Sequence, residues 1–273
     1  MNKLRMLSVA VAAVAMVGQV ATAQEPRTPK EEFIVGGEPA VEGAFPWQVA
    51  LIGGDDAEGQ RGQFCGGSIV APEWVLTAAH CVDNFFVQRD PANLDVVAGT
   101  LKYAEGGQRV DATAIIVHPN WDDPSFDFDA ALIKLSAPLK MGAAISLAAA
   151  NAEIPVDFTV RVSGWGATTE GGAGSEDLLF VDVPAVTNET CNKPESYGGR
   201  VTDQMLCAGK STGGFDSCQG DSGGPAVAEI TDDGFTLVGV VSWGTGCARP
   251  LFYGIYTRVS TISEWVTETI ASN

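Results

Sequence analysis

The chain has 273 residues, of which 45% are hydrophobic and 32 are glycine, and its formal net charge is −18. This length allows one large core or two smaller cores that share an interface. The excess of Asp and Glu argues against nucleic acid as a partner, because nucleic-acid binding depends on basic clusters. Two interpretations of the charge stay open: a solvated surface, or a field that attracts basic substrates.

Residues 1–23 have the pattern of a secretory signal peptide. Lys3 and Arg5 form a basic start, residues 6–17 are mostly apolar, and Ala21-Thr22-Ala23 resembles a cleavage site. The apolar run is short for a bilayer core of roughly 30 Å, and no later stretch is apolar enough to span one. We therefore predict a secreted, extracellular protein with no membrane anchor.

Residues 24–33 are polar, charged and proline-containing, which predicts a flexible activation propeptide before a domain at 34–273. In that domain, short runs of β-branched and aromatic residues alternate with turn signals. Phe158, Val160 and Val162 alternate with polar residues, as in a half-buried strand. Near the end, apolar residues recur on one face of a short helix. These patterns indicate an all-β protein with one final helix.

Six cysteines, an even number without a C-x-x-C pair, favour disulfides over a zinc or redox site in an exported protein. The stretch "SCQGDSGGP" places Ser222 among turn-forming residues. A serine hydroxyl becomes a nucleophile only beside a base that an acidic group orients. His80 in "TAAHC" and His118 in "HPNW" are the two histidines, and Asp127 and Asp129 in "FDFDAALIKL" are candidate carboxylates.

The segments "TAAHC", "DAALIKL" and "GDSGGP" each occur once, in this order. The chain from Ile34 to Asn273 thereby resembles the trypsin/chymotrypsin family of secreted serine proteases. The resemblance implies two antiparallel β-barrels, at about 45–140 and 150–260, with the active site between them and a C-terminal helix at about 261–271. His80 then becomes the general base, Asp129 its orienting carboxylate and Ser222 the nucleophile. His118 and Asp127 fall outside these roles.

The resemblance assigns further residues. The backbone N–H groups of Gly220 and Ser222 would form the oxyanion hole, and Ser242 would support Asp129. The implied disulfides are Cys65–Cys81, Cys191–Cys207 and Cys218–Cys247. Because His80 must be neutral to act as a base, activity is expected to fall in acid.

The implied specificity is for Arg or Lys before the scissile bond. Asp216 would lie at the base of the primary pocket, where a carboxylate needs a cation. Gly244 and Gly254 would leave room for a long side chain. The remaining predicted substrate-binding residues are Ser217, Gln219, Ser242 and Trp243.

The family is made as zymogens, and the resemblance implies that the new terminus at Ile34 pairs with Asp221. The residue before it is Phe33, where trypsin-like zymogens usually have Arg or Lys. We therefore expect a different protease, acting at Phe33–Ile34, to activate this chain.

The remaining expectations concern partners, ions and alternatives. Protein and peptide substrates and protein inhibitors are the expected partners of a monomer, from a bacterial source. No cofactor is expected to be required. Calcium and sodium stay unassigned, although Tyr253 resembles the residue of sodium-responsive members. Asn188 begins an N-glycosylation sequon. Two alternatives stay open: an inactive binding protein of the same fold, and a protease with a chymotrypsin-like or mixed preference.

Overall fold

A computed structural model describes residues 34–53, 62–83, 87–231 and 234–273. The expected signal peptide, the propeptide and most of the acidic loop before Cys65 lie outside the described residues. Of the helices described, none is both long and apolar enough to cross a bilayer.

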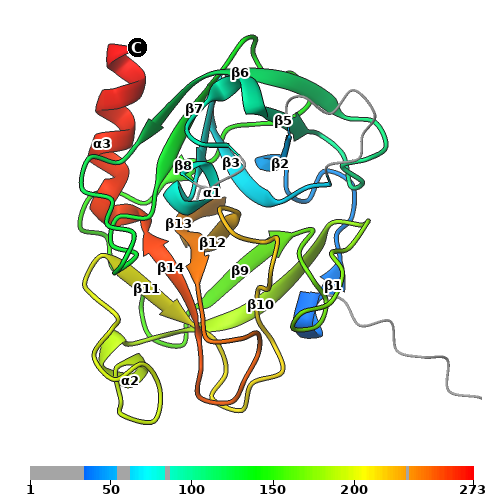
Figure 1. Ribbon diagram of the computed structural model, residues 1–273. Coiled ribbons are helices and arrows are strands. Elements are labelled where there is room, and N and C mark those ends of the chain that lie inside the picture. The colour runs from blue at the N-terminus through cyan, green and yellow to red at the C-terminus, as the bar shows by residue number, and fades with distance from the viewer. Residues whose placement is uncertain (1–33, 54–61, 84–86, 232–233) are drawn as a thin grey trace, which may run out of the picture. The chain divides into compact units, whose positions relative to one another are not determined.

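The first ring of strands is a closed barrel (Figure 1). Its strand order is β2-β3-β4-β7-β6-β5, and every pairing is antiparallel. Their bounds are β2 Gln48–Gly53, β3 Cys65–Ala71, β4 Trp74–Thr77, β5 Leu94–Ala98, β6 Gln108–Val117 and β7 Ala131–Leu135. All of β2 and β5 is buried, which explains their near-continuous apolar runs.

The second ring closes because β9 pairs with both β10 and β12. Its six strands are β9 Thr159–Gly164, β10 Leu179–Val186, β11 Met205–Ala208, β12 Pro225–Thr231, β13 Gly234–Trp243 and β14 Gly254–Arg258. In β9, the buried Val160 and Val162 alternate with the exposed Thr159 and the half-buried Arg161, as predicted. Two short strands attach to this ring: β1 Glu38–Pro39 beside β10, and β8 Ser146–Leu147 parallel to β13.

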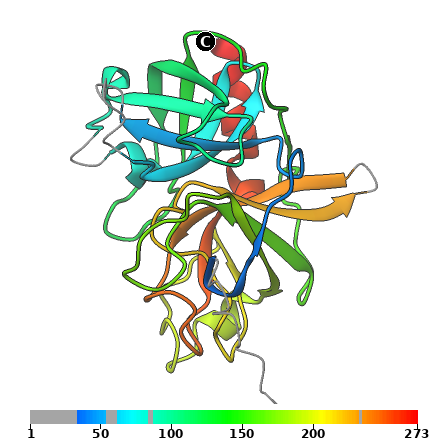
Figure 2. The ribbon, with the colours of Figure 1, turned by 90° about the vertical axis from the view of Figure 1, so that its right-hand side faces the viewer.

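The helices are few and mostly short. They are η1 Ile34–Gly36, α1 Ala79–Val82, η2 Pro91–Asn93, α2 Asn188–Cys191 and α3 Val259–Ser272. Figure 2 shows α3 leaving the second barrel and running back along the first. There the Trp265 ring meets the His118 ring, with 4.7 Å between centroids. The expected all-β fold with two barrels and a final helix is therefore confirmed.

Candidate active site

His80 and Asp129 come from neighbouring strands of the first barrel. His80 lies in α1, directly after β4, and Asp129 lies just before β7, which pairs with β4. The disulfide Cys65–Cys81 ties α1 to β3. His80 Nδ1 is 2.7 Å from Asp129 Oδ2, and the His80 backbone N–H donates to Oδ1 at 2.9 Å. Since a carboxylate accepts, this contact places the ring proton on Nδ1 and leaves Nε2 as the acceptor.

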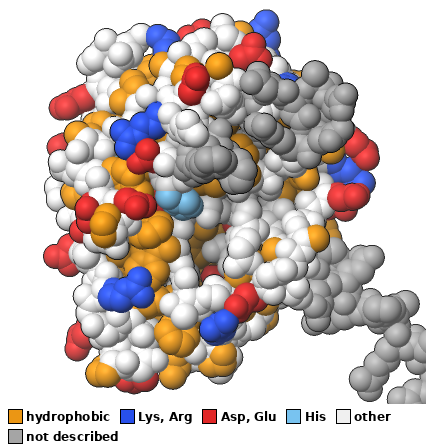
Figure 3. All heavy atoms as spheres, viewed as in Figure 1, with side chains coloured by type: hydrophobic (Ala, Val, Ile, Leu, Met, Phe, Trp, Pro, Cys, Tyr) orange, Lys and Arg blue, Asp and Glu red, His pale blue; other side chains and the backbone are white. Residues whose placement is uncertain are grey.

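The second barrel completes the surroundings of Asp129. Ser242, at the end of β13, donates its hydroxyl to Asp129 Oδ2 at 2.5 Å. The Asp129 side chain is fully buried, whereas 23% of the His80 side chain is exposed. Three donors therefore hold a buried carboxylate, while the imidazole reaches the surface. Figure 3 shows a histidine beside a hollow on this face.

Ser222 lies in the turn that leads into β12, against the segment that precedes His80. Its carbonyl accepts from the Gly66 N–H at 2.7 Å. A Cβ on Gly223 would lie 2.1 Å from Thr77 Oγ1, and Gly223 has a φ of +77°, so only glycine allows this approach. Among the described residues, Ser222 Oγ makes no hydrogen bond to His80. Such contacts often tighten only when substrate binds.

The backbone around Gly220 is held in a conformation that favours glycine, with a φ of +97°. The Gly220 carbonyl accepts from Gln63 Nε2 at 2.6 Å, and the Gln219 carbonyl accepts from the Ala167 N–H at 2.7 Å. Within the described residues, the Gly220 and Ser222 N–H groups donate to no protein acceptor. These two groups are therefore free to receive an oxyanion.

Asp216 and Ser222 line the same cavity, whose volume is about 120 Å³. Six predicted substrate-binding residues also line it: Ser217, Gln219, Ser242, Trp243, Gly244 and Gly254. A Cβ on Gly254 would lie 2.9 Å from Asp216 Oδ1, so any side chain there would press on the carboxylate. A Cβ on Gly244 would meet only ordinary contacts of 3.6 Å or more.

Asp216 is a buried carboxylate with a strongly perturbed titration. The residue is only 6% exposed, and Oδ2 accepts from the Ala248 N–H at 2.9 Å. Burial raises its pKa to about 7, although the hydrogen bonds from Ala248 and Ser217 act in the opposite direction. The ion pairs of the described residues supply no cation to Asp216. A guanidinium or ammonium entering the cavity would relieve this cost.

Asp221 occupies a second buried niche, next to Ser222. It accepts from the Gly166 N–H at 2.8 Å and the Cys218 N–H at 2.9 Å. Burial raises its pKa to about 6, and these two hydrogen bonds lower it by less. The segment that begins at the fully buried Ile34 lies close by, because Val35 packs against a cluster that includes Cys218.

His118, Asp127 and Asn188 make contacts that serve a structural role. The His118 ring stacks on Phe128 at 4.7 Å between centroids, and burial lowers the His118 pKa to about 4. Asp127 accepts from the Thr202 hydroxyl at 2.5 Å. The Asn188 side-chain amide donates to the Thr202 and Met205 carbonyls, so a glycan on this nitrogen would have to displace at least one of the two bonds.

No metal centre emerges from the described residues. The one group of potential ligands is Cys65, His80 and Cys81, and both sulfurs belong to a disulfide. The implied pairings Cys191–Cys207 and Cys218–Cys247 are also formed.

No sequence motif pointed to two neighbours of the site. Gln63 holds the Gly220 carbonyl, and the Phe126 ring lies 5.8 Å from the His80 ring. Both sit in loops outside the three quoted motifs. Only the fold brings them to the site.

Comparison with known proteins shows which proteins this chain resembles. The family model "Trypsin" matches residues 34–266. The chain is 40% identical over 238 residues to "Trypsin 5G1" of Aedes aegypti, covering 86% of this chain and 84% of that protein. It is 38% identical over 246 residues to "Serine protease 1" of Rattus norvegicus, with 89% and 92% covered. It is 41% identical over 235 residues to "Trypsin" of Simulium vittatum, with 84% and 91% covered.

Proposed function

Since the chain belongs to the trypsin family of serine endopeptidases, we propose that it is a secreted zymogen which, once cleaved before Ile34, hydrolyses peptide bonds after Arg and Lys. The observation that carries this proposal is that Ser222 and the buried Asp216 line one cavity. A basic side chain that neutralises Asp216 would bring the carbonyl carbon of its own residue to Ser222 Oγ.

The proposed chemistry uses groups from both barrels. Ser222 Oγ attacks the carbonyl carbon, and His80 Nε2 takes the hydroxyl proton. Asp129, held by Ser242, stabilises the imidazolium and fixes its orientation. The N–H groups of Gly220 and Ser222 receive the oxyanion. His80 then protonates the leaving amine, and a water repeats the cycle on the acyl-enzyme. These steps require no metal or organic cofactor.

Specificity follows from the environment of Asp216. Its raised pKa means that burial disfavours the charged carboxylate. A bound guanidinium restores the charge through a charge-assisted hydrogen-bonded pair. An apolar side chain leaves the unpaired charge in place, which disfavours Phe before the scissile bond. A chymotrypsin-like preference for large apolar side chains is therefore disfavoured.

Activation would use the second buried carboxylate. Cleavage at Phe33–Ile34 would create an ammonium on Ile34, and Asp221 is the buried carboxylate proposed to receive it. Such a pair would stabilise the turn that carries Gly220 and Ser222. Because Phe33 is not basic, a chymotrypsin-like protease or a metalloprotease that cuts before bulky apolar residues would perform this step.

The test of specificity uses the full chain, cleaved before Ile34 by such a metalloprotease that is then removed. Peptides carry Arg, Lys, Phe or Ala before the scissile bond, and Ser222→Ala is the control. A strong Arg/Lys preference that vanishes in the variant supports the proposal. Activity on Phe instead would keep the mechanism and overturn the pocket. No activity, with Ile34 verified as the terminus, would favour the binding-protein alternative.

The test of activation incubates the uncleaved Ser222→Ala chain with the active enzyme. We expect slow or misplaced cleavage, for example after Arg27 or Lys30, and no clean release of Ile34. Prompt formation of an Ile34 terminus would refute the need for another protease.

A further inference from the structure

The loop 192–204, between α2 and β11, holds an arginine against a wall of the specificity pocket. The guanidinium carbon of Arg200 lies 4.7 Å from the centroid of the Trp243 ring, a cation–π contact. Trp243 lines the cavity that also contains Asp216 and Ser222. Arg200 is thus the basic side chain stacked on a residue that a substrate would touch.

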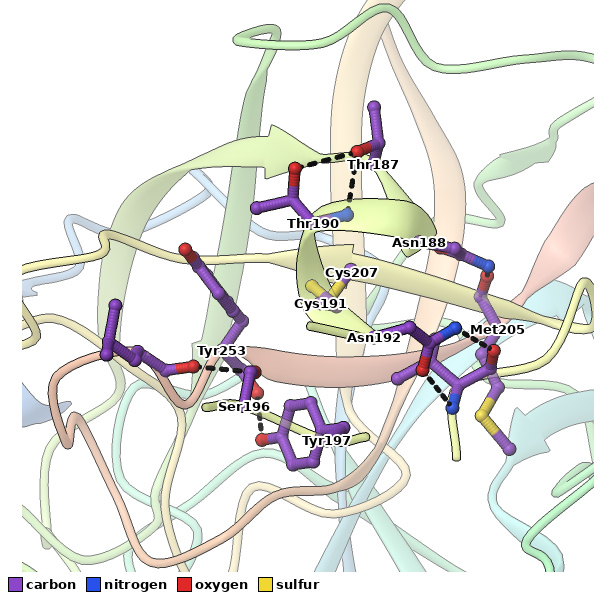
Figure 4. The surroundings of a disulfide bond; sticks show 12 residues. Thr187, Asn188, Thr190, Cys191, Asn192, Ser196, Tyr197, Met205, Cys207 and Tyr253 are labelled. Atoms are coloured by element: carbon purple, nitrogen blue, oxygen red, sulfur yellow. Dashed lines mark hydrogen bonds between the residues drawn. A yellow bond between two sulfur atoms is a disulfide. The ribbon is translucent and has the colours of Figure 1, made fainter. Parts of the chain in front are cut away.

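Several contacts fix this loop in place (Figure 4). The disulfide Cys191–Cys207 closes it. The Asn192 side chain donates to the Val201 carbonyl at 2.7 Å and accepts from the Val201 N–H at 2.8 Å. The Tyr197 hydroxyl donates to the Tyr253 carbonyl at 2.5 Å. The backbone that carries Arg200 is therefore tethered on both sides.

Arg200 lacks the carboxylate partner that several other described arginines have. Four arginines make ion pairs with Asp or Glu within the described residues: Arg89, Arg109, Arg161 and Arg249. Arg200 is exposed, and it belongs to none of the ion pairs among the described residues. From residue 34 onward, the chain has 31 acidic and 12 basic residues, giving −19. A guanidinium left unpaired in so acidic a domain is available to a ligand.

The path of a bound peptide follows from the edge of β13. On its β12 side, backbone bonding ends at Val241, whose N–H donates to the Gly224 carbonyl and whose carbonyl accepts from the Gly223 N–H. The other side pairs with β14 as far as Trp243. Residues 242–244 thus offer one free backbone edge, to which an extended peptide can add as a strand.

The alternation of side chains then relates Arg200 to the substrate. A residue in the Asp216 cavity anchors the peptide beside Ser242. The peptide runs antiparallel past Trp243, advancing about 3.3 Å per residue with side chains on alternate faces. The second residue, counted backward from the scissile bond, then lies opposite Trp243, and the third and fourth follow about 3 and 7 Å further along the strand, near the guanidinium stacked on the Trp243 ring.

We propose that Arg200 is a specificity-determining residue that binds a carboxylate side chain at the third or fourth position before the scissile bond. Preferred substrates would then combine an acidic residue at one of these positions with the Arg or Lys that Asp216 binds. This inference rests on the proposed function, because Asp216 sets the register of the peptide.

The experiment measures kcat/KM for peptides with Arg before the scissile bond and Glu, Gln or Lys at the third or fourth position. For the unmodified enzyme we expect Glu to exceed Gln by about threefold, the size typical of an exposed ion pair. The advantage should shrink in about 0.5 M salt. Arg200→Gln should abolish it, Arg200→Glu should shift preference to Lys, and Arg200→Lys should keep the preference for Glu.

The matched control is Lys193→Gln, which removes another exposed cation from the same loop. It should leave the Glu-to-Gln ratio unchanged. A ratio that survives in Arg200→Gln, or falls equally in Lys193→Gln, overturns the inference. An unmodified enzyme that cleaves the Gln peptide without preferring Glu also overturns it. If no Arg peptide is cleaved at all, the proposed function fails instead.

Discussion

Asp129 and the pair Asp216 and Asp221 are all buried, but they have different partners. Asp129 receives two bonds from His80 and one from the Ser242 hydroxyl. Asp216 and Asp221 receive chiefly backbone N–H groups, and burial raises their pKa values to about 7 and about 6. In the region proposed for chemistry, the fold itself therefore supplies the partners of the buried carboxylate. The region proposed for recognition and activation depends on a cation from a substrate or a new terminus.

The largest expected effect tests the region proposed for chemistry. Asp129→Asn should lower kcat/KM on an Arg peptide by about 10⁴-fold, the magnitude general to this family's mechanism. The amide would donate toward Nδ1 and favour the wrong tautomer of His80. Asp127→Asn, two residues away, is the matched control and should change kcat/KM by less than about twofold. Equal losses in the two variants would contradict the assignment of Asp129.

Replacing Asp216 in the recognition region should lower activity but raise thermal stability. Asp216→Asn should lower kcat/KM on Arg peptides by about 10²- to 10³-fold, the cost of removing one partner of a buried charge pair. Thermal unfolding at pH 8 should occur at a higher temperature, because a buried charge is gone. A variant that loses stability together with activity would show that Asp216 is a structural residue.

A third variant removes one partner of Asp129, so that this carboxylate becomes more like Asp216 and Asp221. Ser242→Ala removes one of the three donors to Asp129. Loss of a hydrogen bond to a buried charged group corresponds to about ten- to a hundredfold in kcat. Substrate KM should change little, because the hydroxyl acts through Asp129. Ser242→Thr should restore part of kcat, and a loss confined to KM would argue for a substrate-binding role.

The pH dependence of stability separates the two states of the recognition region. In the uncleaved chain, the folded pKa values of Asp216 and Asp221 exceed their ordinary value of 3.8. The folded state then binds more protons, so the free energy of unfolding falls as pH rises from about 4 to about 7. An Ile34 ammonium beside Asp221 would lower that pKa. Cleavage of the Ser222→Ala chain should therefore raise the unfolding temperature by several degrees more at pH 8 than at pH 5; equal gains would oppose the pairing.

The smallest effect concerns the rim of the pocket. Glu170 accepts from the Arg249 guanidinium and from the Cys247 N–H, linking two loops beside the cavity. Both side chains are substantially exposed, so Glu170→Gln should raise KM for Arg peptides by only about twofold. Asp182→Asn, which breaks the Arg161 pair away from the cavity, is the control and should leave KM unchanged.

Much of the fold could be predicted because its signals are local. Alternation in β9 and apolar runs such as that in β2 reflect which faces are buried, and burial has a period that a sequence displays. The family motifs named His80, Asp129 and Ser222 and distinguished Asp129 from Asp127. Gln63, Phe126 and Arg200 carried no such signal, because their roles depend on neighbours far away in the chain.

By itself, the sequence determined which residue types are available and, through three short motifs, which family they belong to. Only the tertiary structure decided how each carboxylate is solvated and paired. Ser242 reaches Asp129 across 113 residues, and Gln63 reaches Gly220 across 157. Burial and hydrogen bonding are set by such distant contacts. The same aspartate side chain is therefore held by three donors at Asp129 and left in need of a cation at Asp216.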